Sequence, residues 1–329
     1  MIKQTAGERP LYLFDRRFDS VIRFRIRLPQ GGFRLGGLVM KQRRHRAVSF
    51  FAVALVYAAA VAFGIFVYRK IDGFPLMRVF LADVAATVLV YLFSLPLGNA
   101  SVYDPYWSVA PLVILPLAIT EFGSWNVGSV CLLVCVGYWG LRLTANWAYT
   151  FRGLDHQDWR YSMLKEKSGA LYPLVSLFGI MLFPTVVVYL CLLPALLYIQ
   201  SGAVSLLTCV GFALCLSAAT LQLVADVQMH RFQQTAHSRA EIIRSGVWMH
   251  SRHPNYLGEI LMWWGVFLVM VSALPQYWYF AAGALVNTLM FQFISIPMAE
   301  NRLAEYKAGF ADYVSDTNKL LPFGKRKSA

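Results

Sequence analysis

Long apolar runs recur along this sequence. Residues 49–68 form a stretch of twenty positions without a charged side chain, and a helix needs about 20 such residues to cross the hydrocarbon core of a bilayer. Further charge-free runs cover residues 173–199, 202–225 and 277–299. Their length and continuity predict membrane-spanning helices.

Three more runs carry a single charged residue each: residues 79–98 with Asp83, residues 127–149 with Arg142, and residues 254–273 with Glu259. A shorter run at residues 107–120 fits either a tilted span or a re-entrant segment. In lipid, only helices and closed barrels satisfy the backbone hydrogen bonds. Because these runs are continuously apolar rather than alternating, a barrel is excluded. The pattern predicts an all-α, polytopic membrane bundle of seven to eight transmembrane helices.

Composition agrees with this class. Hydrophobic residues make up 58% of the chain, charged residues 14%, and the mean hydropathy is +0.52. The five cysteines all fall inside predicted helices and lack zinc-ligand spacing with nearby histidines, so we interpret them as packing residues. We therefore expect no metal.

Basic residues set the expected orientation. The first 46 residues contain twelve Lys or Arg against Glu8, Asp15 and Asp19, and such an excess marks the cytoplasmic side. Eight spans would return the C-terminus to that side. The membrane would be the inner membrane of a bacterium or the endoplasmic reticulum of a eukaryote. The net charge of +13 indicates contact with membrane lipids rather than nucleic acid, since no nucleic-acid motif accompanies it.

The same pattern predicts three parts. Residues 1–46 would be a basic cytoplasmic arm, residues 47–100 a transmembrane hairpin, and residues 101–329 a transmembrane domain with a cytoplasmic tail. The last residues include Lys325, Arg326 and Lys327, as a cytoplasmic tail requires.

Ionisable groups at membrane depth are costly, and by default they mark functional sites. The densest polar cluster runs from residue 226 to residue 259 and contains Arg252 and His253 followed by Pro254. Pro254 fits the first position of a new helix. The free N–H groups and positive dipole end of that helix, beside Arg252 and His253, would form a phosphate site. Asn255 and Glu259, four residues apart, would project from one face and hold a neutral polar ring such as a carboxamide.

This cluster carries a family resemblance. The run Arg252-His253-Pro254-Asn255-Tyr256-Leu257-Gly258-Glu259, followed by Trp263-Trp264-Gly265, closely resembles the steroid 5α-reductase C-terminal domain, in its bacterial-type branch of unknown substrate (DUF1295). The similarity extends over roughly residues 104–323. Such proteins are seven-helix bundles that hold NADPH in a cytosol-facing cavity and admit a lipid substrate sideways. The resemblance implies a membrane-embedded, NADPH-dependent reductase of a conjugated carbon–carbon double bond in a lipid or steroid-like enone.

Family roles transfer to individual positions. Asn255 and Glu259 match a polar pair near the nicotinamide, Asp226 matches an acid that contacts the cofactor, and Tyr306 matches a tail tyrosine of the same pocket. The expected cofactor-binding residues are Arg142, Asp226, Arg244, Arg252, His253, Asn255, Tyr256 and Tyr306.

The catalytic residues expected from the resemblance are Tyr138, Glu259 and Asp104. Tyr138 matches the tyrosine that polarises the substrate carbonyl, and its hydroxyl would stabilise the enolate charge that develops during hydride transfer. Asp104 is assigned by location only, because the second carbonyl-binding acid of the family has no counterpart motif here. This departure leaves the substrate open.

Two other functions fit the same residues. Isoprenylcysteine- and phospholipid-type methyltransferases, which use S-adenosylmethionine, share an Arg-His-Pro-x-Tyr segment at the same helix start and a similar acidic tail. Asn255, Glu259 and the double tryptophan favour the reductase. A non-catalytic lipid-binding membrane protein is the third interpretation, under which Tyr138 and Glu259 would be replaceable without loss.

Overall fold

The structure is a computed structural model, which describes the backbone of residues 35–323 and side chains from residue 45 onward. Most of the predicted basic arm at residues 1–46 and the final basic residues lie outside this part. Between residues 35 and 323 the chain forms helices and connecting loops, without a strand. The predicted all-α fold is confirmed.

Eight helical segments of the described chain are long and apolar enough to cross a membrane. They are His45–Lys70, Pro75–Leu97, Ala100–Phe122, Val127–Thr150, Trp159–Ser201, Leu206–Thr235, Pro254–Ala273 and Pro275–Tyr306. The ambiguous run at residues 107–120 belongs to the third segment. The chain is therefore a multi-pass membrane protein at the upper end of the expected helix number.

The first four spans contain α1 (Leu35–Lys70), α2 (Pro75–Leu97), η2 (Ala100–Tyr103) with α3 (Tyr106–Phe122), and α4 (Val127–Thr150). The later spans contain α7 (Phe183–Ser201), α8 (Leu206–Thr235), α9 (Pro254–Ala273), and α10 (Ala281–Met290) with α11 (Ile296–Tyr306). A short 3-10 turn η5 (Gly246–Met249) precedes α9, and α12 (Phe310–Asp316) follows α11.

Two spans are not regular α-helices. The fifth is built from α5 (Trp159–Ser168), η3 (Gly169–Leu171), α6 (Tyr172–Leu174), the π-helical η4 (Val175–Leu182) and α7. The eighth contains η6 (Pro275–Phe280), α10, the π-helical η7 (Phe291–Ser295) and α11. The Asp158 side chain caps α5, the first part of the fifth span, by accepting a hydrogen bond from the Arg160 N–H at 2.9 Å. An Asp at this position satisfies a free backbone donor of the first turn.

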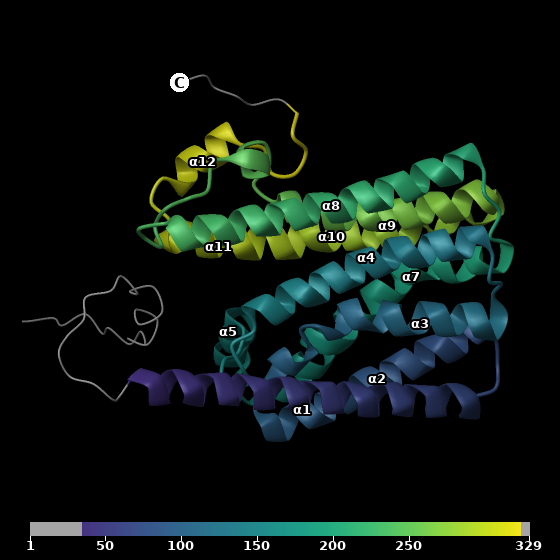
Figure 1. Cartoon of the computed structure of the whole chain (residues 1–329), viewed down its shortest axis with the longest axis horizontal. Coiled ribbons are helices and arrows are strands. Elements are labelled where there is room, and N and C mark those ends of the chain that lie inside the picture. Colours follow the sequence, from purple (N-terminus) through teal and green to yellow (C-terminus); the bar gives the residue numbers. More distant parts are fainter. Residues whose placement is uncertain (1–34, 324–329) are drawn as a thin grey trace, which may run out of the picture.

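The helices lie roughly parallel to one axis (Figure 1). At one end of the bundle α4 and α8 end, α9 begins, and α12 packs beside the end of α8. We call this the tail end, and it is the end that the sequence predicts to be cytoplasmic. Helices α8 and α9 approach closely, since a Cβ added at Gly258 would lie 2.7 Å from the Ala218 carbonyl oxygen. Small residues permit such close helix contacts in membranes.

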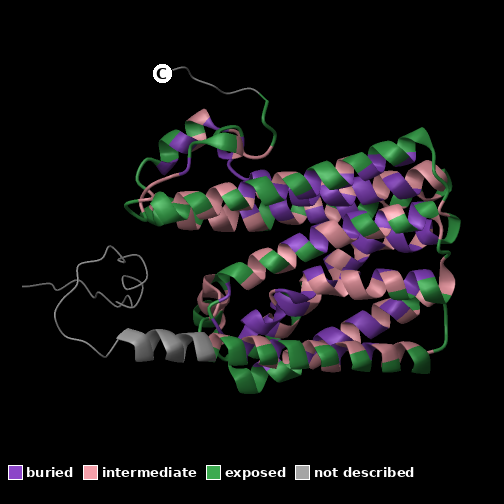
Figure 2. Cartoon of the chain, in the orientation of Figure 1, coloured by how far each residue is buried: buried purple, intermediate pink, exposed green. Residues whose placement is uncertain are grey.

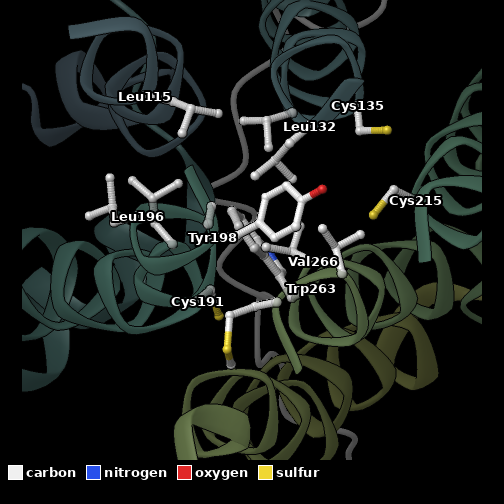
Figure 3. Close-up of a cluster of buried hydrophobic side chains, with 14 of the residues drawn as sticks. Leu115, Leu132, Cys135, Cys191, Leu196, Tyr198, Cys215, Trp263 and Val266 are labelled. Atoms are coloured by element: carbon white, nitrogen blue, oxygen red, sulfur yellow. The ribbon is translucent and has the colours of Figure 1, made fainter. Parts of the chain in front are cut away.

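The main core lies where α3, α4, α7, α8 and α9 meet (Figure 2). Its side chains include Leu132 of α4, Tyr198 of α7 and Trp263 of α9, which converge in Figure 3. Large apolar side chains also cover the outer faces, as at Phe51 and Phe293, which are 66% and 70% exposed. A soluble protein would rarely expose such continuous apolar surface, so these faces fit contact with lipid tails.

Candidate functional site

Glu259 lies in the second turn of α9 and is 6% exposed. Its Oε2 accepts a hydrogen bond from Trp139 Nε1 of α4 at 2.8 Å, and its Oε1 accepts one from Trp263 Nε1 at 2.8 Å. The two indole rings pack edge to face with their centroids 4.9 Å apart. Buried polar groups are stable only when hydrogen-bonded, and this carboxyl group is held by two neutral donors.

Arg142 of α4 extends toward the same region and is buried. Its Nη1 lies 2.7 Å from Asp226 Oδ2, and its Nη2 donates to the Gln222 side-chain oxygen. Arg142 also interacts electrostatically with Glu259. Two buried donors, Arg142 Nε and Gln222 Nε2, have no hydrogen-bond partner. We refer to Trp139, Arg142, Gln222, Asp226, Glu259 and Trp263 as the polar network.

Further polar pairs lie between α4 and α8 on both sides of the polar network. Toward the tail end, the Asn146 side-chain oxygen lies 2.7 Å from His230 Nε2. Toward the opposite end, the hydroxyls of Tyr138 and Thr220 are 3.4 Å apart. A line of polar pairs therefore runs from the tail end of the bundle to the polar network and beyond it.

Arg252 and His253 form a second group, which we call the tail clamp together with Glu300 of α11. Glu300 Oε1 accepts from Arg252 Nε at 2.8 Å and lies 2.9 Å from His253 Nε2. Arg252 Nη1 donates to the carbonyls of Val314 and Thr317. The clamp fastens the C-terminal segment to the beginning of α9.

Further bonds hold this segment in place. The Arg252 backbone N–H donates to the Asn318 carbonyl at 2.9 Å, and the Tyr313 hydroxyl donates to the Trp248 carbonyl at 2.6 Å. Burial raises the pKa of Tyr313 to about 12, against the effect of the cations Arg252 and Arg244. Arg244 itself lies 3.5 Å from Asp316 Oδ2 on the surface.

Other expected cofactor residues lie close to the tail clamp. Tyr256 stacks on the His253 ring with centroids 5.2 Å apart. The Asn255 side-chain oxygen, in the first turn of α9, accepts from the Tyr256 backbone N–H at 3.1 Å. Tyr306, at the end of α11, is exposed.

Asp104 lies apart from these residues, between η2 and α3. Its Oδ1 accepts a hydrogen bond from the Tyr161 hydroxyl at 2.6 Å. Among the described residues, Asp104 forms no hydrogen bond with Glu259 or Tyr138.

An apolar cavity of about 170 Å³ opens between α1, α2 and α3. Its lining is mostly aliphatic, but Asp83 and Tyr106 contribute polar atoms, and the Tyr106 hydroxyl donates to Asp83 Oδ1 at 2.8 Å. Asp83, the single charged residue of its predicted span, thus lies in the lining of the cavity. The rings of Trp107 in α3 and Trp139 in the polar network are tilted against each other, with centroids 6.2 Å apart.

The residues predicted from sequence therefore lie in separate groups in the structure. It brings Arg142, Asp226 and Glu259 together, places Tyr138 on the same helix as Arg142, and joins Arg252 to His253 in the clamp. Sequence reasoning missed Gln222 and the role of Trp139. The spacing of Gln222, Asp226 and His230 at four-residue intervals on one helix face is the signal that points to Gln222.

Within the described residues, no group of three or more His, Cys, Asp or Glu side chains has an arrangement that would hold a metal ion. No curated protein and no solved structure matches the chain. A family model does match, over residues 90–317. That stretch begins in α2 and contains the polar network, the tail clamp and the whole of α12. The chain belongs to the family described as "Protein of unknown function (DUF1295)".

Proposed function

We propose that this protein is a membrane-embedded reductase that uses NADPH to reduce a conjugated carbon–carbon double bond in a lipid or steroid-like enone. The observation that carries the proposal is the polar network, in which a buried Arg142 and Gln222 keep two donors without partners. Such donors are costly when unpaired, and ionisable residues at membrane depth mark functional sites. A bound polar molecule would satisfy them.

The residues present fit a nicotinamide cofactor in two places. Arg142 Nε and Gln222 Nε2 suit an acceptor such as a carboxamide oxygen or a ribose hydroxyl. Arg252 and His253, at the N-terminus of α9, suit a phosphate, which would compete with Glu300 for their donors. NADPH supplies the hydride for the reduction when it is bound.

The cavity between α1, α2 and α3 supports the substrate side of the proposal. Its aliphatic lining suits an apolar molecule, and the Tyr106–Asp83 pair suits a carbonyl oxygen. A tyrosine hydroxyl that donates to this oxygen stabilises the negative charge that builds there during reduction. Tyr106 thus joins Tyr138 as a candidate for this donor, and Asp83 joins Asp104 as a candidate for the acid.

Trp107 follows the cavity residue Tyr106 in α3, and its ring centroid lies 6.2 Å from that of Trp139 in the polar network. We therefore assign Trp107 as the wall between the substrate and cofactor sides. Its packing against Trp139, which holds Glu259, links the two.

The direct test is a thermal unfolding assay of the purified protein with NADPH or S-adenosylmethionine. A ligand present at 100 times its Kd stabilises the folded state by about 2.7 kcal/mol. We expect NADPH to raise the Tm of the wild type and of Arg78→Gln, whose guanidinium binds the Tyr68 carbonyl away from the network. Arg142→Gln and Gln222→Leu should lose the response.

The same assay separates the alternatives. A response to S-adenosylmethionine alone would replace the reductase with a methyltransferase. No response to either compound, in protein that unfolds cooperatively, would favour the non-catalytic lipid-binding protein. Gln222→Leu leaves the Arg142–Asp226 ion pair in place, so it keeps the test usable if Arg142→Gln does not fold.

A further inference from the structure

The cavity between α1, α2 and α3 is long and narrow. The residues that line it begin at Tyr57 and end at Arg69 in α1, and begin at Tyr106 and end at Phe122 in α3. These stretches correspond to about 18 Å and about 24 Å along the two helix axes. The volume is only about 170 Å³, close to that of an engineered cavity of about 150 Å³ that holds one benzene molecule. A space of this length and volume accepts a single lipid chain, whereas fused rings need a wider one.

One end of this cavity is charged. Arg69 of α1 and Glu121 of α3 line it there, where α1 and α3 end and α2 begins, at the end of the bundle opposite to the tail end (Figure 1). Both side chains are exposed. Neither forms a hydrogen bond or an ion pair with another described residue. Their charges are therefore free to act on a ligand.

Two more cations lie beside Arg69. Lys70 follows it and is exposed. Arg78, near the start of α2, donates to the Tyr68 carbonyl from Nε at 3.1 Å and from Nη2 at 2.8 Å. This bond holds the Arg78 guanidinium at the end of α1, so three positive charges gather at the charged end of the cavity.

The position of these cations is unusual for this side of the membrane. The sequence predicts it to be the side opposite to the cytoplasm, where Lys and Arg are scarce. The other connections at this end, residues 123–126, 202–205 and 274–280, contain no charged residue. Asp72 and Glu121 are the acids present there, so basic residues are in excess, and they are concentrated at the cavity. A ligand with a negative charge explains this placement.

Deeper in the cavity lies one polar pair, in which the Tyr106 hydroxyl donates to Asp83 Oδ1 at 2.8 Å. A Cβ added at Gly64 of α1 would lie 3.4 Å from the carbonyl oxygen of Ala82, so Asp83 lies at the level of Gly64. Five residues separate Gly64 from Arg69, which is about 8 Å along the helix axis. A ligand whose head group lies at Arg69 therefore presents the first part of its chain to this pair.

We propose that the cavity binds a single-chain lipid with an anionic head group, such as a long-chain carboxylate. The chain lies between α1, α2 and α3, and the head group binds Arg69 and Lys70. Removal of the apolar chain from water supplies most of the affinity. The cations select an anionic head group over a neutral one.

This inference narrows the substrate of the proposed reductase, and to that extent it rests on the proposed function. The conjugated double bond and its carbonyl would lie about 8 Å from the head group, beside Tyr106 and Asp83. A chain lipid with an acidic end would then be the substrate in place of a steroid. Binding itself requires neither the cofactor nor the reaction.

Binding is measured with tritium-labelled oleate on the purified full-length protein, without NADPH and at a pH at which oleate is ionised. Oleyl alcohol has the same chain without the charge, and progesterone is a neutral steroid enone. We expect oleate to bind at least about fivefold more tightly than oleyl alcohol, and progesterone to compete weakly. Equal binding of oleate and oleyl alcohol, or tighter binding of progesterone than of oleate, would overturn the proposal.

Two substitutions at the charged end should have opposite effects. Arg69→Gln should weaken oleate binding about fivefold and leave oleyl alcohol binding unchanged. Glu121→Gln should strengthen oleate binding, because it removes a like charge. Arg231→Gln, which removes an exposed cation at the tail end of α8, is the control and should bind oleate like the wild type. Unchanged oleate binding in Arg69→Gln, or weaker binding in Glu121→Gln, would contradict an anionic head group at this end.

Filling the cavity tests the position of the chain. Val113→Phe adds volume to the lining from α3 and should weaken binding of oleate and of oleyl alcohol at least tenfold. Ile65→Trp fills the cavity from α1 and replaces it if Val113→Phe does not fold. Val134→Phe, at a position of α4 that is 57% exposed, should leave both affinities unchanged. Wild-type oleate binding in the folded cavity variants would overturn the proposal. Because the assay contains no NADPH, its result is independent of the cofactor-binding test.

Discussion

Trp139 Nε1 and Glu259 Oε2 are joined by a hydrogen bond of 2.8 Å that connects α4 to α9 inside the bundle. A second indole, from Trp263, occupies the other carboxyl oxygen at 2.8 Å. The acid is thus fixed in position on both sides by donors that carry no charge. A rigidly held acid of this kind is more typical of a binding site than of a surface anchor.

Replacing Glu259 tests this geometry. In Glu259→Gln only one side-chain oxygen remains, so one of the two indoles loses its acceptor. Hydrogen bonds to charged groups contribute about 1.5–3 kcal/mol, and we expect a loss of stability in this range, measured by thermal unfolding. Trp264→Phe is the control, because Trp264 binds Thr288 instead. A Tm for Glu259→Gln equal to that of the wild type would contradict the buried arrangement.

The Arg142–Asp226 ion pair has a matched surface counterpart in Arg244–Asp316. The side chains of the first pair are 5% and 14% exposed, and those of the second are 47% and 41% exposed. Asp226→Asn leaves a buried Arg without its counter-charge, which costs about 3–5 kcal/mol. Asp316→Asn should cost about 1 kcal/mol or less. Equal unfolding temperatures for the two variants would show that Arg142 finds another partner.

Arg252 has two candidate roles, phosphate binding and the tail clamp, and the Glu300→Gln variant distinguishes them. If Arg252 binds phosphate, Arg252→Ala should weaken NADPH binding by roughly ten- to a hundredfold. Glu300→Gln should not weaken it, because the cation is kept. If Arg252 acts only in the tail clamp, both variants should loosen the C-terminal segment alike and leave NADPH affinity similar. Titration with NADPH and limited proteolysis at Lys319 provide the two measurements.

Tyr138 and Tyr106 compete as donors to the substrate carbonyl. Loss of one such donor costs about 10²–10³ in turnover, and the loss should appear in kcat rather than in KM. Tyr138 has a 3.4 Å contact with Thr220, whereas Tyr106 lies in the cavity lining, where its hydroxyl donates to Asp83. We expect Tyr106→Phe to have the larger effect on enone reduction, normalised to protein that binds NADPH. A larger kcat loss in Tyr138→Phe would return the role to the residue expected from sequence.

The C-terminal segment should respond to alkaline pH through Tyr313. Burial raises the pKa of this phenol from 10.0 to about 12, so the folded state holds the proton more tightly than the unfolded chain. The stabilisation is complete below pH 10 and is lost as the pH rises toward about 12. Thermal unfolding against pH should fall more steeply in this window for the wild type than for Tyr313→Phe. Tyr306→Phe, at an exposed position, should behave like the wild type.

Much of this architecture follows from the sequence. Charges inside otherwise apolar runs identified Arg142 and Glu259, because a membrane helix tolerates them only with a partner or a function. The partners were harder to find. Gln222 and Trp139 lie on helices far apart in the chain, and helix spacing does not show which faces will meet.

Two residues show why local pattern was insufficient. Asp83 is visible in the sequence as the single charge of its span, but its partner Tyr106 belongs to another helix. Arg252 looked free for a ligand because Glu300, its ion-pair partner, comes 48 positions later. Both cases depend on tertiary contacts that have no periodic signal in the sequence.

The tail clamp can form only after the last helices have been synthesised. Arg252 leaves the ribosome well before Glu300 and Thr317, so the start of α9 enters the membrane with its cation and imidazole unpaired. These groups gain their partners only when the last helices have been made. A chain that stops before residue 300 would expose an uncompensated Arg and His beside the bilayer, where unpaired charges are costly. Incomplete chains would therefore differ from finished ones by two unpaired groups at the start of α9.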